Sequence, residues 1–378
     1  MDHWIITNRQ IVKVGGRETV NEKDHEPLPS FRIAKFTVPA ADASDDAYRA
    51  AVELIPDKAD SSYRPADPQA DPDRLKGTAQ IFLSLYQAMS NAPADKGDTL
   101  VFLHGFNYSW VDSLRHLAKL HELYVADARS PIAQIVYFSW PSFGDVLKYH
   151  SDQPIALDSG SALGRLFRKV GEFYASSFAG KSAVPYCGRK LHLAAHSMGN
   201  QVLDAFCKVV NGFDGLHLNL FSEVVLLNAD ADWSVLDPQQ PLANLNEYSD
   251  RTHVYCNHHD EALLISETTK NREKRLGRHG PKDIADIPPR TVVVDVTDDV
   301  LTTAGKVPDL DQFAANAEQI LRRSGLLIGL KETLVQHWGY LYRPDIIADV
   351  QAVFRGESAS AIAARSKKTD DLFSLKPK

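Results

Sequence analysis

The chain has 378 residues, of which 44% are hydrophobic and 24% are charged, and its formal net charge at pH 7 is −7. This composition is typical of a globular protein that is long enough to bury a large core. It argues against a nucleic-acid partner, because phosphate binding needs a concentrated basic surface and a short basic run such as 365–368 does not supply one.

The sequence also predicts a cytoplasmic location. Residues 1–20 contain charged side chains and no apolar block of signal length, and no later run approaches the roughly 20 apolar residues of a membrane span. Cys187, Cys207 and Cys256 are an odd number without CxxC spacing, so neither a disulfide framework nor a cysteine zinc site is expected. We therefore expect no integral membrane segment and a reducing compartment.

The N-terminal part of the chain is expected to contain short strands, an exposed loop and a helix. Residues 56–74 are rich in Pro, Asp, Ser and Ala and predict the loop. The helix that follows contains Ile81, Leu85 and Met89 at helical spacing. The short strands favour an antiparallel edge on a larger sheet, and they are expected at 4–7, 10–14 and 31–38.

Apolar runs rich in β-branched residues recur from the hundredth residue onward. Near-continuous apolar strands are what a parallel sheet covered on both faces requires. Helical patterns occupy several intervals between the runs, and Ser109 and Asp112 are spaced as a capping box that opens one helix. Alternating strands and helices predict an α/β fold with a doubly wound, mostly parallel sheet. The strands are expected at 99–104, 132–140, 190–196, 223–228, 252–257 and 291–297.

We expect one core unit with additions. The core is predicted to span residues 96–356, with residues 1–95 integrated into it. Residues 141–159 exceed what a strand-to-helix connection needs and predict a short cap over the site. Residues 357–378 lose apolar periodicity and predict a mobile tail.

The most informative motif lies where an apolar strand runs into Ser197. Ala195 and Gly199 flank this serine two positions away on each side. Small residues are required there when a strand turns sharply into a helix and holds the serine in a strained backbone conformation. The same spacing recurs at 175–179 and 356–360, but without a preceding strand. Ser197 is therefore the predicted nucleophile.

A serine nucleophile requires a base and an acid that orients the base. In hydrolases with such an elbow, the acid and then the base follow the nucleophile, on loops after later strands. His337 is the predicted base, because it lies beyond the last strand, in an expected loop after a helical pattern that ends near Arg323. Asp260 follows the second strand after the nucleophile and is the predicted acid. Asp230 and Asp232, at the end of the intervening strand, remain the alternative acid.

The oxyanion that forms when a serine attacks a carbonyl needs two backbone N–H donors. One is expected from Met198, directly after the nucleophile. The other is expected from Phe106 in the loop after the first core strand, where Gly105 lets the backbone approach a substrate. The sequence thus predicts a serine hydrolase without a cofactor, whose substrate is a small-molecule acyl ester or thioester.

Five short motifs follow one another in a specific order, at 101–108, 138–142, 196–200, 225–232 and 337–340. This set resembles the bacterial α/β-hydrolase family called domain of unknown function 900, which is grouped with esterases and lipases. The likeness covers about residues 95–355, and the opening tripeptide at 7–9 is similar as well. The resemblance implies the α/β-hydrolase fold. Two departures concern Ala195, where the wider motif has glycine, and Trp338, where a smaller residue is expected after the base.

Other functions remain open on the same residues. His253, His258, His259 and Asp260 fall within eight positions, so a metal site at the His258–His259 corner is one alternative, although the segment lacks a zincin helix pattern. A non-catalytic binding module with this fold is another, and an acyltransferase or lipase could use the same triad. A dehalogenase or epoxide hydrolase is disfavoured, because those enzymes carry a carboxylate where Ser197 stands.

Overall fold

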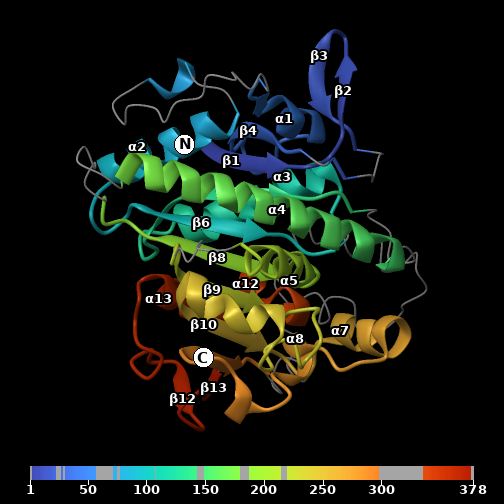
Figure 1. Cartoon of the computed structure of the whole chain (residues 1–378), viewed down its shortest axis with the longest axis vertical. Helices are drawn as coiled ribbons and strands as arrows, with labels where there is room; N and C mark the ends of the chain where they lie inside the picture. Colours follow the sequence, from blue (N-terminus) through green and yellow to red (C-terminus); the bar gives the residue numbers. More distant parts are fainter. Residues whose placement is uncertain are drawn as a thin grey trace.

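The computed structural model describes residues 2–22, 27–28, 30–56, 71–74, 77–106, 108–142, 149–178, 187–213, 219–297 and 335–375. Within these residues, eleven strands form one sheet in the order β12-β13-β11-β10-β9-β8-β6-β7-β1-β4-β5 (Figure 1). The N-terminal, central and C-terminal segments therefore all contribute strands to the same sheet. The strands are β1 Asp2–Thr7, β4 Arg32–Thr37, β5 Val52–Leu54, β6 Asp98–Leu103, β7 Ile132–Ser139, β8 Leu191–His196, β9 Phe221–Leu227, β10 Ser249–Cys256, β11 Thr291–Asp295, β12 Arg365–Lys367 and β13 Leu372–Leu375.

The centre of the sheet is parallel, as the sequence predicts. β8 lies between β6 and β9, with Leu103 opposite Ala195 and His196 opposite Leu227. β10 continues the parallel arrangement beside β9. Parallel strands all end at the same edge of a sheet, which is where ligand sites form in such folds. The segments that follow β6, β8, β9 and β10 therefore meet at one edge.

The antiparallel N-terminal edge is confirmed with one correction. β1 pairs in parallel with β7 and antiparallel with β4, which pairs antiparallel with β5. The strand expected at 10–14 does not join this sheet. It is β2 (Ile11–Val14), which forms a separate hairpin with β3 (Arg17–Val20). Gly15 and Gly16 have φ values of 58° and 81°, and this left-handed turn pairs the flanking strands with each other.

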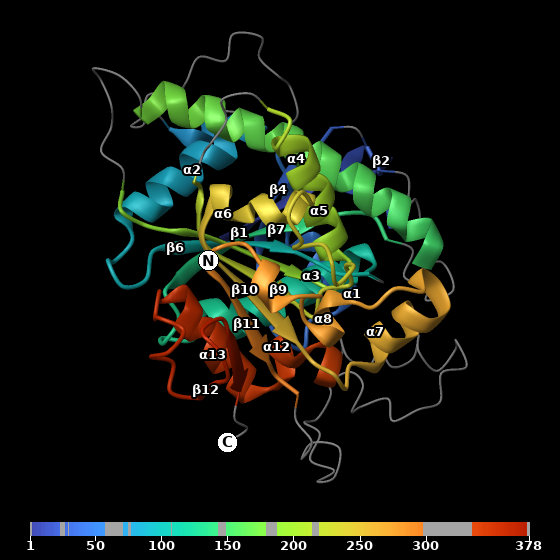
Figure 2. The same cartoon turned by 60° about the horizontal axis from the view of Figure 1, so that its bottom comes forward.

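Helices cover both faces of the sheet (Figures 1 and 2). Buried side chains of α2, α4 and α5 pack in one apolar cluster, and those of α1, α3 and α13 pack in another. The capping box at Ser109 and Asp112 is confirmed at the start of α3. No described helix is long and apolar enough to cross a bilayer. The helices are α1 Asp45–Ala50, α2 Thr78–Asn91, α3 Trp110–Leu120, α4 Tyr149–Phe178, α5 Gly199–Val210, α6 Leu245–Tyr248, α7 Glu261–Ile265, α8 Leu276–His279, α12 Gly339–Tyr342 and α13 Pro344–Phe354.

The C-terminal segment differs from the mobile tail that the sequence predicts. β13 pairs in parallel with β11 and antiparallel with β12. Phe373 and Leu375 are buried against the core, and Arg365 donates hydrogen bonds to Asp349 of α13 at 2.8 and 2.7 Å. Two short strands give too little apolar periodicity to be recognised in a sequence, whereas a buried ion pair and two apolar side chains suffice to anchor them. The domain boundaries themselves remain a prediction.

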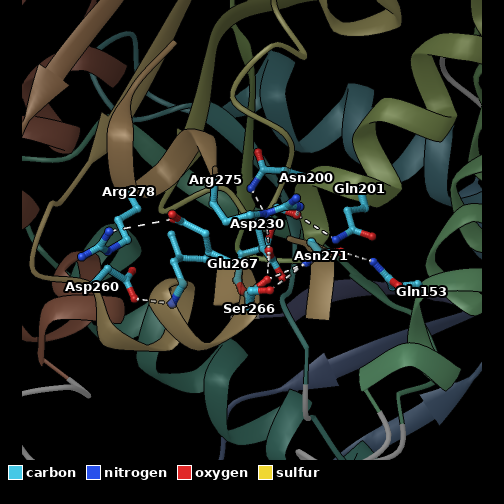
Figure 3. A network of polar contacts seen from close by, with 12 residues as sticks. Gln153, Asn200, Gln201, Asp230, Asp260, Ser266, Glu267, Asn271, Arg275 and Arg278 are labelled. Atoms are coloured by element: carbon cyan, nitrogen blue, oxygen red, sulfur yellow. Dashed lines mark hydrogen bonds and ion pairs between the residues drawn. The ribbon is translucent and has the colours of Figure 1, made fainter. Parts of the chain in front are cut away.

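The structure describes only part of the segment expected as a cap, and the cap stays a prediction. Residues 143–148 lie outside the described residues, as do 57–70 of the expected loop and the helical pattern near Arg323. Tyr149 begins α4, so residues 149–159 are the first turns of this long helix. Gln153 in these turns donates to Asn271 at 2.8 Å (Figure 3). The start of α4 is therefore tied to the segment that follows α7.

Candidate active site

Ser197 occupies the sharp turn between β8 and α5. Its φ is 51°, in the left-handed region that side chains other than glycine seldom adopt. Two main-chain hydrogen bonds fix the turn: Ser197 N donates to Leu227 O at 3.0 Å, and Asp230 N donates to Ser197 O at 3.0 Å. The predicted elbow is thus observed as a backbone conformation, and strain of this kind is typical of functional sites.

Small residues around the elbow are required by close backbone contacts. A Cβ atom added at Gly199 would lie 2.6 Å from the carbonyl oxygens of both Leu103 and His104. Ala195 is fully buried on the other arm of the turn. The alanine that departs from the wider motif is therefore accommodated, whereas any side chain at Gly199 would push α5 away from β6.

His337 and Asp260 lie together in the structure. His337 Nδ1 is 2.8 Å from Asp260 Oδ2, and both side chains are buried. Asp260 also accepts hydrogen bonds from Asn228 Nδ2 at 2.8 Å and from Leu263 N at 2.9 Å. A carboxylate held in this way fixes the proton of the imidazole on Nδ1 and leaves Nε2 as the nitrogen that can accept a proton. The structure therefore brings the predicted base and the predicted acid into one hydrogen-bonded pair.

The surroundings of His337 differ from the open loop that the sequence predicts. Residues 335–337 are helical, and Trp338 separates them from α12. His196 Nε2 is 3.1 Å from His337 O, and Asn228 Nδ2 donates to Gln336 O at 3.2 Å. The segment is held by buried polar contacts from the ends of β8 and β9, which no local sequence pattern encodes. No hydrogen bond joins Ser197 and His337 in this state, and catalytic contacts of this kind often close only on substrate binding.

The alternative acids have hydrogen-bond partners other than His337, and Figure 3 shows those of Asp230. Arg275 Nε donates to Asp230 Oδ1 at 2.8 Å, and Ser266 Oγ donates to the same oxygen at 2.6 Å. Asp232 Oδ1 accepts from the N and the Oγ of Ser234, as in a turn at a strand end. The structure therefore does not bring Asp230 or Asp232 to His337, and it gives both a structural role.

The loop after β6 lies against the elbow, as expected for a source of oxyanion donors. A Cβ atom added at Gly105 would lie 2.9 Å from Ser197 Cβ. Phe106 is half-buried in this loop, Met198 is fully buried at the start of α5, and Asn107 lies outside the described residues. Both predicted donors thus belong to segments that adjoin Ser197, and their role in holding an oxyanion stays a prediction.

Replacing Gly105 with alanine is expected to lower kcat by about ten- to a hundredfold. The new methyl group would meet Ser197 Cβ and, at 3.0 Å, His196 Nδ1, so the loop must move away from the elbow. Steady-state kinetics with an activated ester would measure the change. Gly212→Ala is the control, because the added Cβ would meet only Val209 O, at 3.4 Å. An unchanged kcat in Gly105→Ala would show that this loop does not set the reaction geometry.

Four buried histidines give the protein a predictable response to acid. Burial lowers the pKa of His3 and of His116 to about 3, and lowers the pKa of His104 and His196 well below its usual value. In the unfolded chain these groups bind protons near pH 6.5. Their contribution to stability is therefore complete above about pH 6.5 and is lost as the pH falls from there toward the folded values.

Lowering the pH from 7 to 5 is accordingly expected to reduce the free energy of unfolding, by roughly 2 kcal/mol for each histidine that stays neutral when folded. Chemical denaturation at the two pH values measures the difference. His116→Gln, which removes one of these groups, should reduce the dependence on pH. A free energy of unfolding that is equal or greater at pH 5 would contradict the prediction.

The metal alternative finds no support in the part of the chain that the structure describes. No group of three or more histidine, cysteine, aspartate or glutamate side chains is arranged there to hold a metal ion. His258 is exposed and faces Asp295 at 4.0 Å, while Asp260 points to His337. The side chains of His258 and Asp260 thus make separate contacts.

Two residues that support the site were not identified from the sequence. Asn228 links Asp260 and Gln336 O, and its φ of 42° places it in the left-handed region directly after β9. Asparagine tolerates this conformation better than most residues, so an Asn at the end of a predicted strand was the available signal. His196 holds His337 O, but its position beside the nucleophile is equally consistent with simple packing.

The chain matches a model of a protein family. A family model described as an alpha/beta hydrolase of unknown function (DUF900) matches residues 86–318, which is more than half of the chain. The matched region runs from the end of α2 past β11 and includes Ser197 and Asp260, whereas His337 lies beyond it. No curated protein matches the chain.

Proposed function

Because the chain belongs to the alpha/beta hydrolase family DUF900, we propose that it is a serine hydrolase that cleaves carboxylic esters through an acyl-enzyme on Ser197. One observation carries this proposal. The buried pair of His337 Nδ1 and Asp260 Oδ2, 2.8 Å apart, lies at the sheet edge where Ser197 occupies its left-handed turn. An oriented base near a strained serine is the arrangement that nucleophilic catalysis requires.

In this mechanism Ser197 Oγ attacks the acyl carbonyl while His337 Nε2 accepts the hydroxyl proton. The negative charge of Asp260 stabilises the imidazolium that forms. The backbone N–H groups of Met198 and Phe106 donate to the oxyanion of the tetrahedral intermediate. The C–O bond to the alcohol then breaks, and His337 returns its proton to the leaving alcohol. A water molecule repeats both steps on the acyl-enzyme, releasing the carboxylic acid and restoring Ser197.

The substrate we propose is a small-molecule acyl ester, with thioesters as the related class. Esters come first because an alcohol leaves the tetrahedral intermediate more readily than an amine does, so a serine nucleophile with a histidine base is sufficient. The test is hydrolysis of p-nitrophenyl butyrate and of the matching thioester by purified protein. We expect saturable turnover in wild type and a turnover in Ser197→Ala that is lower by roughly a thousandfold or more. Equal rates of ester hydrolysis in wild type and Ser197→Ala would contradict the proposal.

We also propose a cytoplasmic location. Cys187, Cys207 and Cys256 are free thiols, and Cys207 and Cys256 are buried without a partner cysteine. Unpaired thiols are typical of proteins that remain in a reducing compartment. Cell fractionation with detection of the native protein tests this, and recovery outside the cytoplasm would contradict it.

A further inference from the structure

A half-buried hydrogen bond joins two segments that the proposed mechanism uses. Trp338, which directly follows His337, donates from Nε1 to the Tyr108 hydroxyl at 3.1 Å. Tyr108 lies two residues after Phe106, the proposed oxyanion donor, and only 1% of it is exposed. The base and the oxyanion loop, which are far apart in the sequence, are thus connected through Tyr108, whose hydroxyl also interacts with Tyr340 in the segment after His337.

The main chain of Tyr108 is fixed by hydrogen bonds to Arg9 and Ser142. Arg9 Nη2 donates to Tyr108 O at 2.8 Å, and Arg9 Nε donates to Ser139 Oγ at 3.0 Å. Ser142 Oγ accepts from Tyr108 N and donates to Tyr108 O, both at 2.9 Å. Arg9 is completely buried, and burying a guanidinium costs several kcal/mol unless its contacts compensate. Tyr108 is therefore tied firmly to the ends of β1 and β7.

The segment that contains Trp338 is also anchored. The Tyr340 hydroxyl is 3.0 Å from His116 Nε2, and Tyr124 donates to Tyr340 O at 2.8 Å. Burial raises the pKa of Tyr108 and Tyr340 well above the usual value and lowers the pKa of His116 to about 3. All of these groups stay neutral around neutral pH. The connection keeps the same hydrogen bonds over the range in which a histidine base works.

We propose that Tyr108 and Trp338 are positioning residues, which together set the distance between His337 and the oxyanion loop. This inference rests on the proposed function. Neither side chain is assigned a contact with the substrate; Trp338 acts through the adjacent His337, and Tyr108 acts through the loop that contains Phe106. Because a displacement of about 1 Å in a catalytic group can cost a hundredfold in rate, one hydrogen bond that fixes two loops can influence turnover strongly. Trp338, which stands where a smaller residue is expected after the base, is thus proposed to position His337.

The test is a double-mutant cycle on the full-length protein, with Tyr108→Phe, Trp338→Phe and the double variant. Each single change removes one partner of the hydrogen bond and retains an aromatic ring. We expect each to lower kcat for p-nitrophenyl butyrate by about tenfold, with KM within about twofold. The double variant should be no more than about twofold slower than the slower single variant, since Tyr108→Phe already removes the contact that Trp338→Phe removes, together with the interaction of its hydroxyl with Tyr340.

A matched control separates positioning from stability. Tyr248→Phe also removes a buried tyrosine's hydroxyl contact, with Asn211 Oδ1 at 2.9 Å, but far from the elbow. It should keep the wild-type kcat, and thermal unfolding should show that all variants are folded at the assay temperature. Single variants with wild-type kcat, or effects that multiply in the double variant, would overturn the proposal.

Failure of the proposed function would look different. Wild-type protein that neither turns over esters nor reacts with a fluorophosphonate would remove the hydrolase proposal and this inference with it. Wild-type protein that does both, while Tyr108→Phe and Trp338→Phe equal it in kcat, would remove this inference alone.

Discussion

Replacing Ser197 with alanine is expected to lower kcat for an ester substrate by roughly a thousandfold or more. The substitution removes the only oxygen on which the acyl group is proposed to be carried. The residual rate would come from substrate binding and the oxyanion donors alone. Steady-state kinetics at saturating substrate measures kcat, and thermal unfolding checks the fold.

The fold should survive this change, because alanine lacks only the hydroxyl group. The left-handed turn at Ser197 is fixed by main-chain contacts with Leu227 and Asp230, which alanine retains. Folded Ser197→Ala that turns over substrate at the wild-type rate would show that another residue carries the reaction.

Replacing Asp260 with asparagine is expected to lower kcat by roughly a thousand- to ten-thousandfold. The asparagine oxygen can still accept from Leu263 N, which places its NH₂ group toward His337 Nδ1. That imidazole nitrogen would then have to accept a hydrogen bond, and the proton would move to Nε2. A histidine protonated on Nε2 cannot accept the proton of Ser197, so the reaction loses its base.

Asp230→Asn is the matched control for this prediction, because it makes the same chemical change at the alternative acid. It removes a buried charge that is paired with Arg275, so the free energy of unfolding should fall by about 3 kcal/mol. Its kcat should stay within about threefold of wild type. A severe loss of kcat in Asp230→Asn with a mild effect in Asp260→Asn would reverse the assignment of the acid.

Much of the fold follows from local pattern. The six strands expected from apolar, β-branched runs correspond to β6 through β11, because strands buried on both faces must be apolar along their whole length. The capping box of α3 and the elbow at Ser197 were predicted because each depends on residues close together in the sequence. The sequence does not predict the short strands β12 and β13. An ion pair between Arg365 and Asp349 anchors them, and such a contact leaves no periodic pattern in the sequence.

The sequence proposes the members of the candidate site but not the residues that support them. The order of Ser197, Asp260 and His337 along the chain suggested that they would meet at the ends of parallel strands, and the last two do so. The contact of Tyr108 with Trp338 depends on how distant loops pack, which a sequence does not encode locally. For the same reason the helical surroundings of His337 were not foreseen.

The most direct test of the central claim is reaction of purified wild-type and Ser197→Ala protein with a fluorophosphonate, read by intact mass. Only a serine whose hydroxyl is activated by a neighbouring base forms this adduct readily. We expect one adduct on wild-type protein, at Ser197, and none on Ser197→Ala. No adduct on folded wild-type protein, or an equal adduct on both, would contradict it.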